Sequence, residues 1–299
     1  MSSSRANRRG IVAIVAATAT FTANDTIVKI IARTCPLGEV VFVRGLMTCV
    51  LVGGVMASLG HVSALRAGLS RVVMMRSGCE ALAAILFTTA LVHMPLAELS
   101  AVILISPLVI TVLAVVLLGE IVYWRRWTAI AVGFAGVLFV VKPTPSAFDA
   151  WALLGVLCAF VSATRDLLTR RLDPRIPTIV VSLMAAVAAT IAGAVLGLWE
   201  SWRALQPAEI GLLAVAAVLL ATGNFLVVIA FRGPEISVVA PFRYSILVWA
   251  GIAGVIVFGE IPDRWSLIGA ALIVGSGVYA LHREAVRGRE VASRATPGT

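Results

Sequence analysis

Ten long apolar segments, separated by short connections, constrain this chain more than any other feature of its sequence. Each has about 20 residues, the length that an α-helix needs to cross the hydrocarbon core of a bilayer. None shows the alternation of apolar and polar residues that is typical of membrane barrels, so helices are the expected spanning elements. The segments cover residues 10–32, 37–59, 72–92, 96–118, 125–142, 150–170, 177–199, 208–231, 236–258 and 265–281.

The composition favours a membrane protein over a soluble one. Hydrophobic residues make up 60% of the 299 residues and charged residues only 13%, whereas a soluble domain has roughly 25% charged residues. Every tryptophan except Trp249 lies near the end of a segment, where its amphipathic ring favours the headgroup level. We therefore predict an all-α integral membrane fold with ten transmembrane helices.

The first segment also has features of a secretory signal peptide. Arg5, Arg8 and Arg9 precede an apolar stretch over residues 11–23, as in the charged and apolar regions of such a peptide. Apolar residues continue to Ala32, so we expect a retained first helix.

Lys and Arg residues predict the orientation, because cytoplasmic loops carry an excess of them. With the N-terminus in the cytoplasm, only Arg33, Lys142, Arg203 and Arg264 lie in connections on the other side. We expect a bacterial inner-membrane protein with both termini cytoplasmic, an N-terminal tail over residues 1–9 and a disordered tail over residues 283–299. This asymmetry, and not nucleic acid, explains the net charge of +9.

A weak internal duplication divides the chain. Gly119-Glu120 followed by Arg126-Trp127 recurs as Gly259-Glu260 followed by Arg264-Trp265. Five segments separate the two copies, and an odd number inverts the second copy in the membrane. Inverted repeats are typical of secondary transporters, whose substrate site lies near the midplane between the halves. We predict five-helix repeats over residues 10–142 and 150–282, joined by a linker over residues 143–149.

These features resemble the drug/metabolite transporter superfamily, specifically its ten-helix permeases with two EamA-type repeats. The resemblance covers residues 10–282 and rests on Asn24-Asp25 with Lys29, Phe42-Val43-Arg44, Pro107 and the two Gly-Glu turns. It implies secondary transport of small metabolites, often amino-acid export, through a central cavity. The Asn-Asp and Lys pattern is also similar to members that take up cofactors such as S-adenosylmethionine.

Charged residues inside the first two segments predict an outer cluster. Such residues cost roughly 2.5–3.5 kcal/mol each and usually face a cavity or a partner. Asp25 and Arg44 both lie roughly 10–12 Å below the outer surface, at about 1.5 Å per residue. Lys29 lies on the same helix face as Asp25. We expect Asp25, Lys29 and Arg44 to lie together with Asn24 beside them, unless Lys29 extends outward to the interface.

A second set lies deeper toward the cytoplasm and comprises Glu80, Arg165, Asn224 and Arg243, with Tyr244 beside Arg243. Glu80 is the carboxylate well inside this half, so we predict that it pairs with Arg243. Tyr244 adjoins Arg243 but points roughly 100° away around the helix. Arg165 is expected to be an ordinary interface charge.

Two depths of charge suggest outer and inner closures with a substrate held between them. An amino acid presents a carboxylate, which Arg44 or Arg243 can meet, and an ammonium group, which Asp25 or Glu80 can meet. The alternative is that these residues form buried ion pairs that only fix helix register. Glu120 and Glu260, at the repeated turns, are expected to cap or close the connections, and Pro107 indicates either a packing kink or a cavity-lining break.

Other function classes have little support. The sequence has no HExxH, GxSxG or P-loop motif, so we expect neither an enzyme nor a bound cofactor. Its four cysteines are scattered and predict neither disulfides nor a metal site. A flippase for lipids or lipid-linked sugars stays open, as does a membrane scaffold.

Energy coupling and assembly are only partly constrained. Without an ATP-binding segment, active transport must be driven by a proton or substrate gradient, with Asp25 or Glu80 as candidate proton carriers. The Gly-rich helices of the fifth and tenth segments suggest a homodimer as one option.

Overall fold

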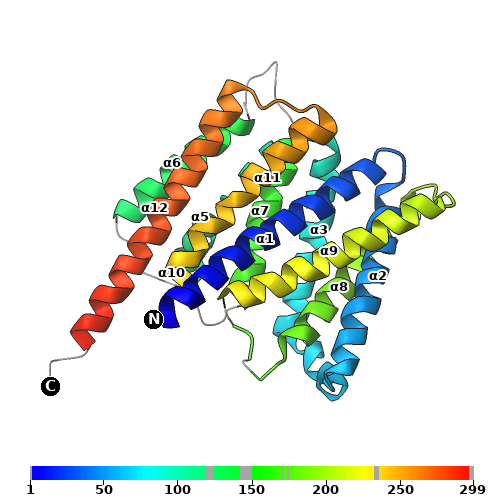
Figure 1. Cartoon of the computed structure of the whole chain (residues 1–299), viewed down its shortest axis with the longest axis horizontal. Coiled ribbons are helices and arrows are strands. Elements are labelled where there is room, and N and C mark those ends of the chain that lie inside the picture. The colour runs from blue at the N-terminus through cyan, green and yellow to red at the C-terminus, as the bar shows by residue number, and fades with distance from the viewer. Residues whose placement is uncertain are drawn as a thin grey trace.

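The computed structural model describes residues 2–118, 124–141, 150–169, 171–173, 175–231 and 236–295. Within these ranges every regular element is a helix, as the apolar segments predict (Figure 1). The elements are α1 Ser2–Ile31, α2 Leu37–Ser58, η1 Val62–Leu69, α3 Arg71–His93, α4 Leu96–Ile103, α5 Ser106–Leu118, α6 Trp124–Val141, α7 Ala150–Thr169, α8 Thr178–Leu196, η2 Gly197–Trp199, α9 Pro207–Phe231, α10 Ile236–Val239, η3 Ala240–Ser245, α11 Ile246–Ala253, η4 Gly254–Phe258 and α12 Arg264–Ala295.

Eight helical stretches in the described residues are long and apolar enough to cross a membrane. Two shorter apolar helices, Trp127–Val141 and Arg264–Ala280, coincide with the fifth and tenth predicted segments. The all-helical membrane fold expected from the sequence is therefore confirmed for the described residues.

Both ends of the chain are more helical than expected. α1 begins at Ser2, inside the predicted tail, and α12 continues to Ala295. The prediction that the chain is disordered after His282 is therefore wrong for residues 283–295. Arg, Glu and Ala dominate this stretch, and all three are good helix formers, so the helix has no reason to stop where the apolar sequence does.

Two of the predicted spanning segments are interrupted. The fourth breaks into α4 and α5 just before Pro107, which lacks the N–H that an unbroken helix requires. The ninth begins as α10, tightens into the 3₁₀ segment η3 at Pro241, continues as α11 and ends in the π-helical turn η4. Mid-helix segments of this kind are frequent at hinges and functional sites.

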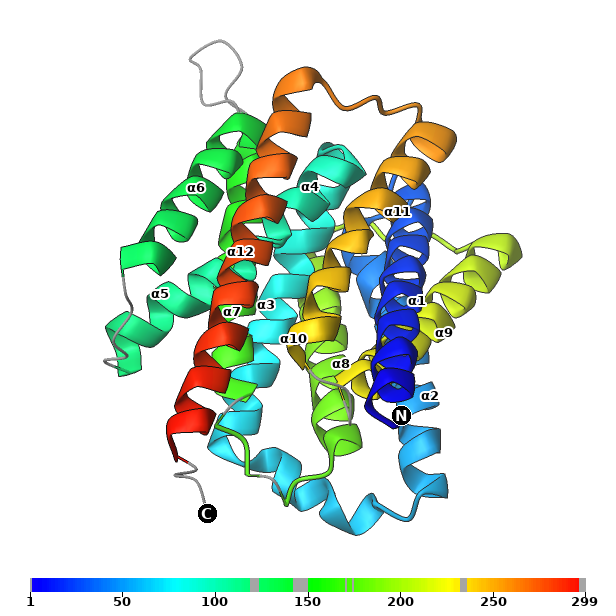
Figure 2. The same cartoon turned by 60° about the vertical axis from the view of Figure 1, so that its left-hand side comes forward.

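Helices from the first half of the sequence pack along helices from the second half. α1 lies along α9, α2 along α8, α3 along α7 and α8, and α6 along α12 (Figures 1 and 2). The N-terminus of α1 and the C-terminal end of α12 lie at the same end of the bundle (Figure 2). We call this the termini end; the connection from α11 to α12 lies at the opposite end.

Buried apolar side chains gather around α4, which begins at the opposite end. Leu96, Leu99 and Val102 of α4, together with Ile105 and Leu108 at the break that follows it, are almost completely buried. Toward the termini end a much smaller cluster joins α1, α9 and α10 through Ala13, Ile14, Ala230 and Val239. α4 is thus held by the core, whereas fewer apolar contacts fasten the termini end.

α6 and α12 approach each other through glycines. A Cβ on Gly136 would lie 2.8 Å from the carbonyl oxygen of Gly269, and a Cβ on Gly269 would lie 2.5 Å from that of Gly136. Only a residue without a side chain allows this separation, as in other close helix pairs of membrane proteins. These glycines pack the fifth and tenth segments against each other, so they offer no separate argument for a homodimer.

Candidate functional site

A buried ion pair joins α1 to the turn after η4. Lys29 is 2% exposed and its Nζ lies 2.5 Å from Oε1 of Glu260. Nζ also donates to the carbonyl oxygen of Met94, at 2.6 Å, where α3 ends. The ring of Phe258 lies 4.9 Å from the same Nζ, a distance at which an aromatic face attracts a cation. Lys29 therefore ties three parts of the bundle together at the opposite end.

Glu260 reaches this position because of the glycine before it. Gly259 has φ of 67°, a left-handed conformation that glycine adopts without steric cost. The second oxygen of Glu260, Oε2, accepts a hydrogen bond from the N–H of Leu96 at 2.9 Å. Leu96 is the first residue of α4, where backbone N–H groups have no partner within the helix. Glu260 therefore caps α4, which is distant in sequence, and not the connection in which it lies; neither this contact nor its pairing with Lys29 was predicted.

A second contact fastens α4 at the same end. Oγ of Ser266, in the first turn of α12, donates to Oε1 of Glu98 at 2.5 Å. α4 is thus tied to the turn after η4 by Glu260 and to α12 by Ser266.

A polar chain crosses from α2 to α1 about one helical turn below the ion pair. Nη1 of Arg44 donates to Oδ1 of Asn24 at 3.2 Å, and Nδ2 of Asn24 donates to Oδ1 of Asp25 at 2.8 Å. Asn24 is only 2% exposed, so its amide is a buried bridge between the cation and the carboxylate. The expected meeting of Asn24, Asp25 and Arg44 is confirmed.

Lys29 does not complete this cluster as predicted. Both sequence-based alternatives, membership of the Asp25 cluster and extension to the interface, are wrong, because Lys29 is buried and paired with Glu260. The Glu260 turn comes 231 residues later in the chain, and no local pattern indicates which turn a helix will meet.

Glu80 has a different partner from the one predicted. Both of its carboxylate oxygens lie 3.3 Å from Nη1 of Arg165 on α7, and Oε2 lies 3.5 Å from Nη2 of Arg76. Arg165 in turn binds Asp166, at 2.8 Å. The predicted pair with Arg243 is therefore wrong, because α3 packs on α7 and brings Glu80 to Arg165.

The remaining predicted residues are not drawn into these clusters. Arg243 is exposed, and its guanidinium forms no hydrogen bond or ion pair with another described residue. Asn224 is exposed as well, and its Nδ2 donates to the carbonyl of Leu220, at 2.9 Å. Tyr244 is buried, with its hydroxyl against Gly277 and without a hydrogen-bond partner among the described residues. As predicted, Arg243 and Tyr244 face different sides.

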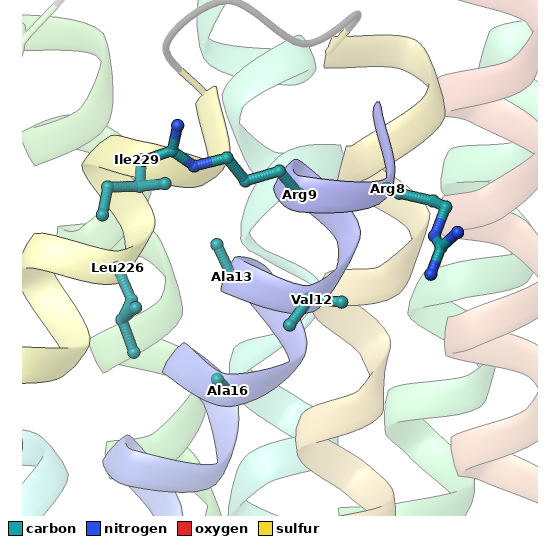
Figure 3. Close-up of a pocket in the computed structure, with 7 residues that line it drawn as sticks. All are labelled: Arg8, Arg9, Val12, Ala13, Ala16, Leu226 and Ile229. Atoms are coloured by element: carbon teal, nitrogen blue, oxygen red, sulfur yellow. The ribbon is translucent and has the colours of Figure 1, made fainter. Parts of the chain in front are cut away.

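A shallow groove of about 420 Å³ lies between α1 and α9 at the termini end. Val12, Ala13, Ala16, Leu226 and Ile229 line it beside two arginines. Arg9 extends over the groove toward Ile229, whereas Arg8 points away from it (Figure 3). None of the eight predicted site residues lines this groove.

Several residues of these clusters had weak or no sequence signals. Glu260 carried a signal, its repetition in the Gly-Glu turns, but the pattern indicated only a turn. Arg165 lies near a segment end, which made it resemble an interface charge. Glu120, the counterpart of Glu260 in the first repeat, lies outside the described residues.

Comparison with known proteins now identifies the family. Residues 8–142 and residues 149–281 each match the EamA-like transporter family. The chain belongs to this family. The predicted membership of the drug/metabolite transporter superfamily is confirmed.

Named relatives of this EamA-type chain are transporters. The pseudopaline exporter CntI of Pseudomonas aeruginosa is 29% identical over 89% of this chain and 94% of its own. A riboflavin transporter of Rhizobium johnstonii is 30% identical over 75% of this chain and 72% of its own. An S-adenosylmethionine uptake transporter of Rickettsia bellii is 28% identical over 60% of this chain and 61% of its own. The chain is accordingly a multi-pass membrane transporter of small molecules.

A solved structure supports the fold. One crystal structure matches with a TM-score of 0.64 and covers 93% of this chain and 97% of its own, at 18% sequence identity. At that identity the likeness concerns the fold alone.

Proposed function

We propose that this EamA-type protein is a secondary transporter that moves an amino acid or a related small polar metabolite by alternating access. Export across the bacterial inner membrane is the direction we favour. The observation that carries the proposal is the arrangement of charges along α1. The Lys29–Glu260 pair closes the opposite end, and the chain from Arg44 through Asn24 to Asp25 lies one turn further into the membrane.

The opposite end is the closed side in this proposal. α1, α4 and the turn after η4 meet there through Lys29, Glu260 and the N–H of Leu96, and the apolar core surrounds α4. A substrate at Asp25 can reach that side only when the ion pair separates. Because both charges are largely withdrawn from water, this separation needs either water entry or new partners.

Two exposed side chains support an opening toward the termini end. Asn224 lies on the same face of α9 as Leu213 and Ala217, which are completely buried, yet Asn224 itself is exposed. Arg243 likewise precedes Ala250 by two helical turns and is exposed, whereas Ala250 is buried. Exposure on a face that is buried further along is what an opening at that level would produce. The Glu80, Arg76 and Arg165 cluster lies in this half and is our candidate inner closure.

Helix pairing supports the inverted repeats. Numbered as ten crossings, the contacts join crossing 1 with 8, 2 with 7, 3 with 6 and 5 with 10. When each crossing of the first half is exchanged with its counterpart in the second half, 1 with 6, 2 with 7, 3 with 8 and 5 with 10, the same four pairs result. Such exchange symmetry is expected for two inverted five-helix repeats. The family matches over residues 8–142 and 149–281 are consistent with the repeats that we propose over 10–142 and 150–282.

The proposed orientation has both termini in the cytoplasm. The positive-inside bias is its basis, and the structure is compatible with it because both termini lie at one end (Figure 2). The termini end is then cytoplasmic, and the Lys29–Glu260 pair closes the outer side.

Arg44 and Asp25 are the basis for proposing a substrate with both a carboxylate and an ammonium group. Arg44 donates one hydrogen bond to Asn24 and Asp25 accepts one from it, so both retain hydrogen-bonding capacity for a carboxylate and an ammonium group. We favour export as the direction of transport because the pseudopaline exporter aligns over 89% of this chain. The alternative is uptake of a cofactor, as the relatives named for S-adenosylmethionine and riboflavin suggest.

The direct test uses purified protein in proteoliposomes loaded with a mixture of radiolabelled amino acids. Efflux faster than from protein-free vesicles is the expected result, measured with and without a proton gradient to assign coupling. Lipid scrambling in the same vesicles reports flippase activity. Scrambling without amino-acid efflux would refute the proposal in favour of a flippase.

Two substitutions test the role of the charges. Arg44→Met and Glu80→Leu should each abolish flux while membrane expression persists, because each removes a charge from a proposed binding or closing cluster. Thr88→Val, on α3 like Glu80, is the control, since the Thr88 hydroxyl only bonds its own backbone, at Ala84. If both substituted proteins transport normally, these charges fix helix register and do not bind or gate.

A further inference from the structure

One face of α1 carries a polar stripe. Thr18, Thr22, Asp25 and Lys29 follow each other at intervals of four, three and four residues, the spacing that keeps side chains on one side of a helix. The stripe faces the broken ninth segment, since α1 packs against η3 and α11 (Figure 2). We call this contact the α1–α11 seam.

The stripe is fastened to the ninth segment at both of its ends. Toward the termini end, Oγ1 of Thr18 and Oγ of Ser245 share a hydrogen bond of 2.8 Å. At the opposite end, Lys29 pairs with Glu260. Between these contacts α1 and α11 run in the same direction, so residues one turn beyond Thr18 and one turn beyond Ser245 lie at the same level. Those residues are Thr22 and Trp249.

Both of these residues carry a buried polar atom without a hydrogen-bond partner among the described residues. The atoms are Oγ1 of Thr22, whose residue is 4% exposed, and Nε1 of Trp249. Buried polar groups are rarely left unpaired, because each costs roughly 1–3 kcal/mol. Trp249 is also the one tryptophan that the sequence places inside a span. Two such atoms at one level of a helix seam indicate partners that a ligand supplies.

Asp25 lies on the same stripe, about one turn beyond Thr22. Its Oδ1 accepts from Asn24, and its side chain is only partly buried although it belongs to the interior stripe. Asp25 therefore keeps some accessible surface between the two fastened ends of the seam. The seam therefore offers an anionic acceptor, a hydroxyl and an indole N–H within about two helical turns.

We propose that the α1–α11 seam between Thr18 and Lys29 is the substrate site, and that it takes a primary ammonium compound carrying a hydrogen-bond acceptor next to the amine. Asp25 binds the ammonium group, Nε1 of Trp249 donates to the neighbouring acceptor, and Thr22 accepts from the ammonium group or donates to the acceptor. The proposal rests on the transport function above and makes its substrate class more specific. It also assigns a role to the two fastenings, because the substrate passes Thr18–Ser245 on one side and Lys29–Glu260 on the other.

The test measures binding and stability separately in nanodiscs. A panel of L-amino acids is screened by thermal shift, and the best binder is compared with its deaminated acid and its decarboxylated amine by calorimetry. The amino acid should bind best and the amine more weakly, while the deaminated acid should not bind. Asp25→Asn should abolish binding, and Thr22→Val and Trp249→Phe should each weaken it about tenfold, the effect of one lost hydrogen bond of about 1.4 kcal/mol.

Stability without ligand separates binding from packing. Because Thr22 Oγ1 and Trp249 Nε1 have no hydrogen-bond partner within the described part of the chain, deleting them should leave the melting temperature unchanged or raise it. Thr88→Val and Trp199→Phe are matched controls, since Thr88 bonds its own backbone and Trp199 is 78% exposed; neither should change binding.

The outcomes are distinguishable. Wild-type flux with unaltered binding in Thr22→Val and Trp249→Phe overturns the seam site and leaves the transporter intact. A lowered melting temperature with normal binding overturns it too, because the two residues then serve packing. If the wild type neither binds nor moves any amino acid, the amino-acid function itself fails and the seam proposal fails with it.

Discussion

Replacing Lys29 by Met should destabilise the protein more than any other single loss of charge discussed above. The change removes the 2.5 Å ion pair with Glu260, the hydrogen bond to the Met94 carbonyl and the contact with Phe258. Removing one partner of a buried pair costs about 3–5 kcal/mol, because the other charge stays buried and uncompensated. Glu260 is 21% exposed and keeps the N–H of Leu96 as a partner. Because its charge is then partly compensated, we expect the cost to lie at the lower end of this range, about 3 kcal/mol.

The assay is thermal unfolding of purified variants, combined as a double-mutant cycle. For a chain of this length, a loss of about 3 kcal/mol lowers the melting temperature by roughly 5 °C. Glu260→Gln should cost a similar amount, because it leaves Lys29 buried without a counter-charge. The double variant Lys29→Met/Glu260→Gln should be no less stable than the worse single variant, which corresponds to a coupling of about 3 kcal/mol.

Arg33→Met provides the matched control. Arg33 contacts the same Phe258 ring, with Cζ at 4.8 Å from its centroid, but it is exposed. Its loss should cost under about 0.5 kcal/mol. Additive effects of Lys29→Met and Glu260→Gln in the double variant would refute the reasoning, because the two groups would then not act as a pair.

Three further results are expected. Glu80→Gln should cost only about 1 kcal/mol in thermal unfolding, because Glu80 is 30% exposed and Arg165 keeps Asp166 as a partner. A loss as large as that of Lys29→Met would contradict this. Gly136→Ala should lower stability by about 1–3 kcal/mol, since the new methyl group meets the backbone of Gly269. Gly275→Ala, where the new methyl group has no atom within 4 Å, should be neutral or stabilising, and equal effects of the two changes would show that α6 and α12 are not in glycine contact. Burial raises the pKa of the Cys35 thiol, in the connection between α1 and α2, so less thiolate is present at neutral pH. In a variant that retains only this cysteine, the alkylation rate should be lower than that of a free thiol and should keep rising above the pH at which the rate for free thiols levels off. A rate profile like that of a free thiol would refute the burial.

The sequence by itself determined the helical membrane fold and most helix boundaries. Runs of about 20 apolar residues leave no other stable arrangement in lipid, because every backbone polar group must be paired within the element. The breakers at Pro95 and Pro107 are equally local, since proline removes a helical hydrogen bond wherever it stands. The meeting of Asn24, Asp25 and Arg44 could also be predicted, because similar depth on consecutive helices already brings side chains together.

Only the tertiary structure decided which distant charges meet. Glu80 pairs with Arg165 and not Arg243 because α3 packs on α7, and Lys29 pairs with Glu260 because α1 packs on the ninth segment. Depth in the membrane can be counted along a sequence, but the azimuth of one helix relative to another depends on side-chain packing over the whole bundle. The stripe from Thr18 to Lys29 could be read as one helix face, whereas its facing partners, Ser245, Trp249 and Glu260, emerged only from that packing.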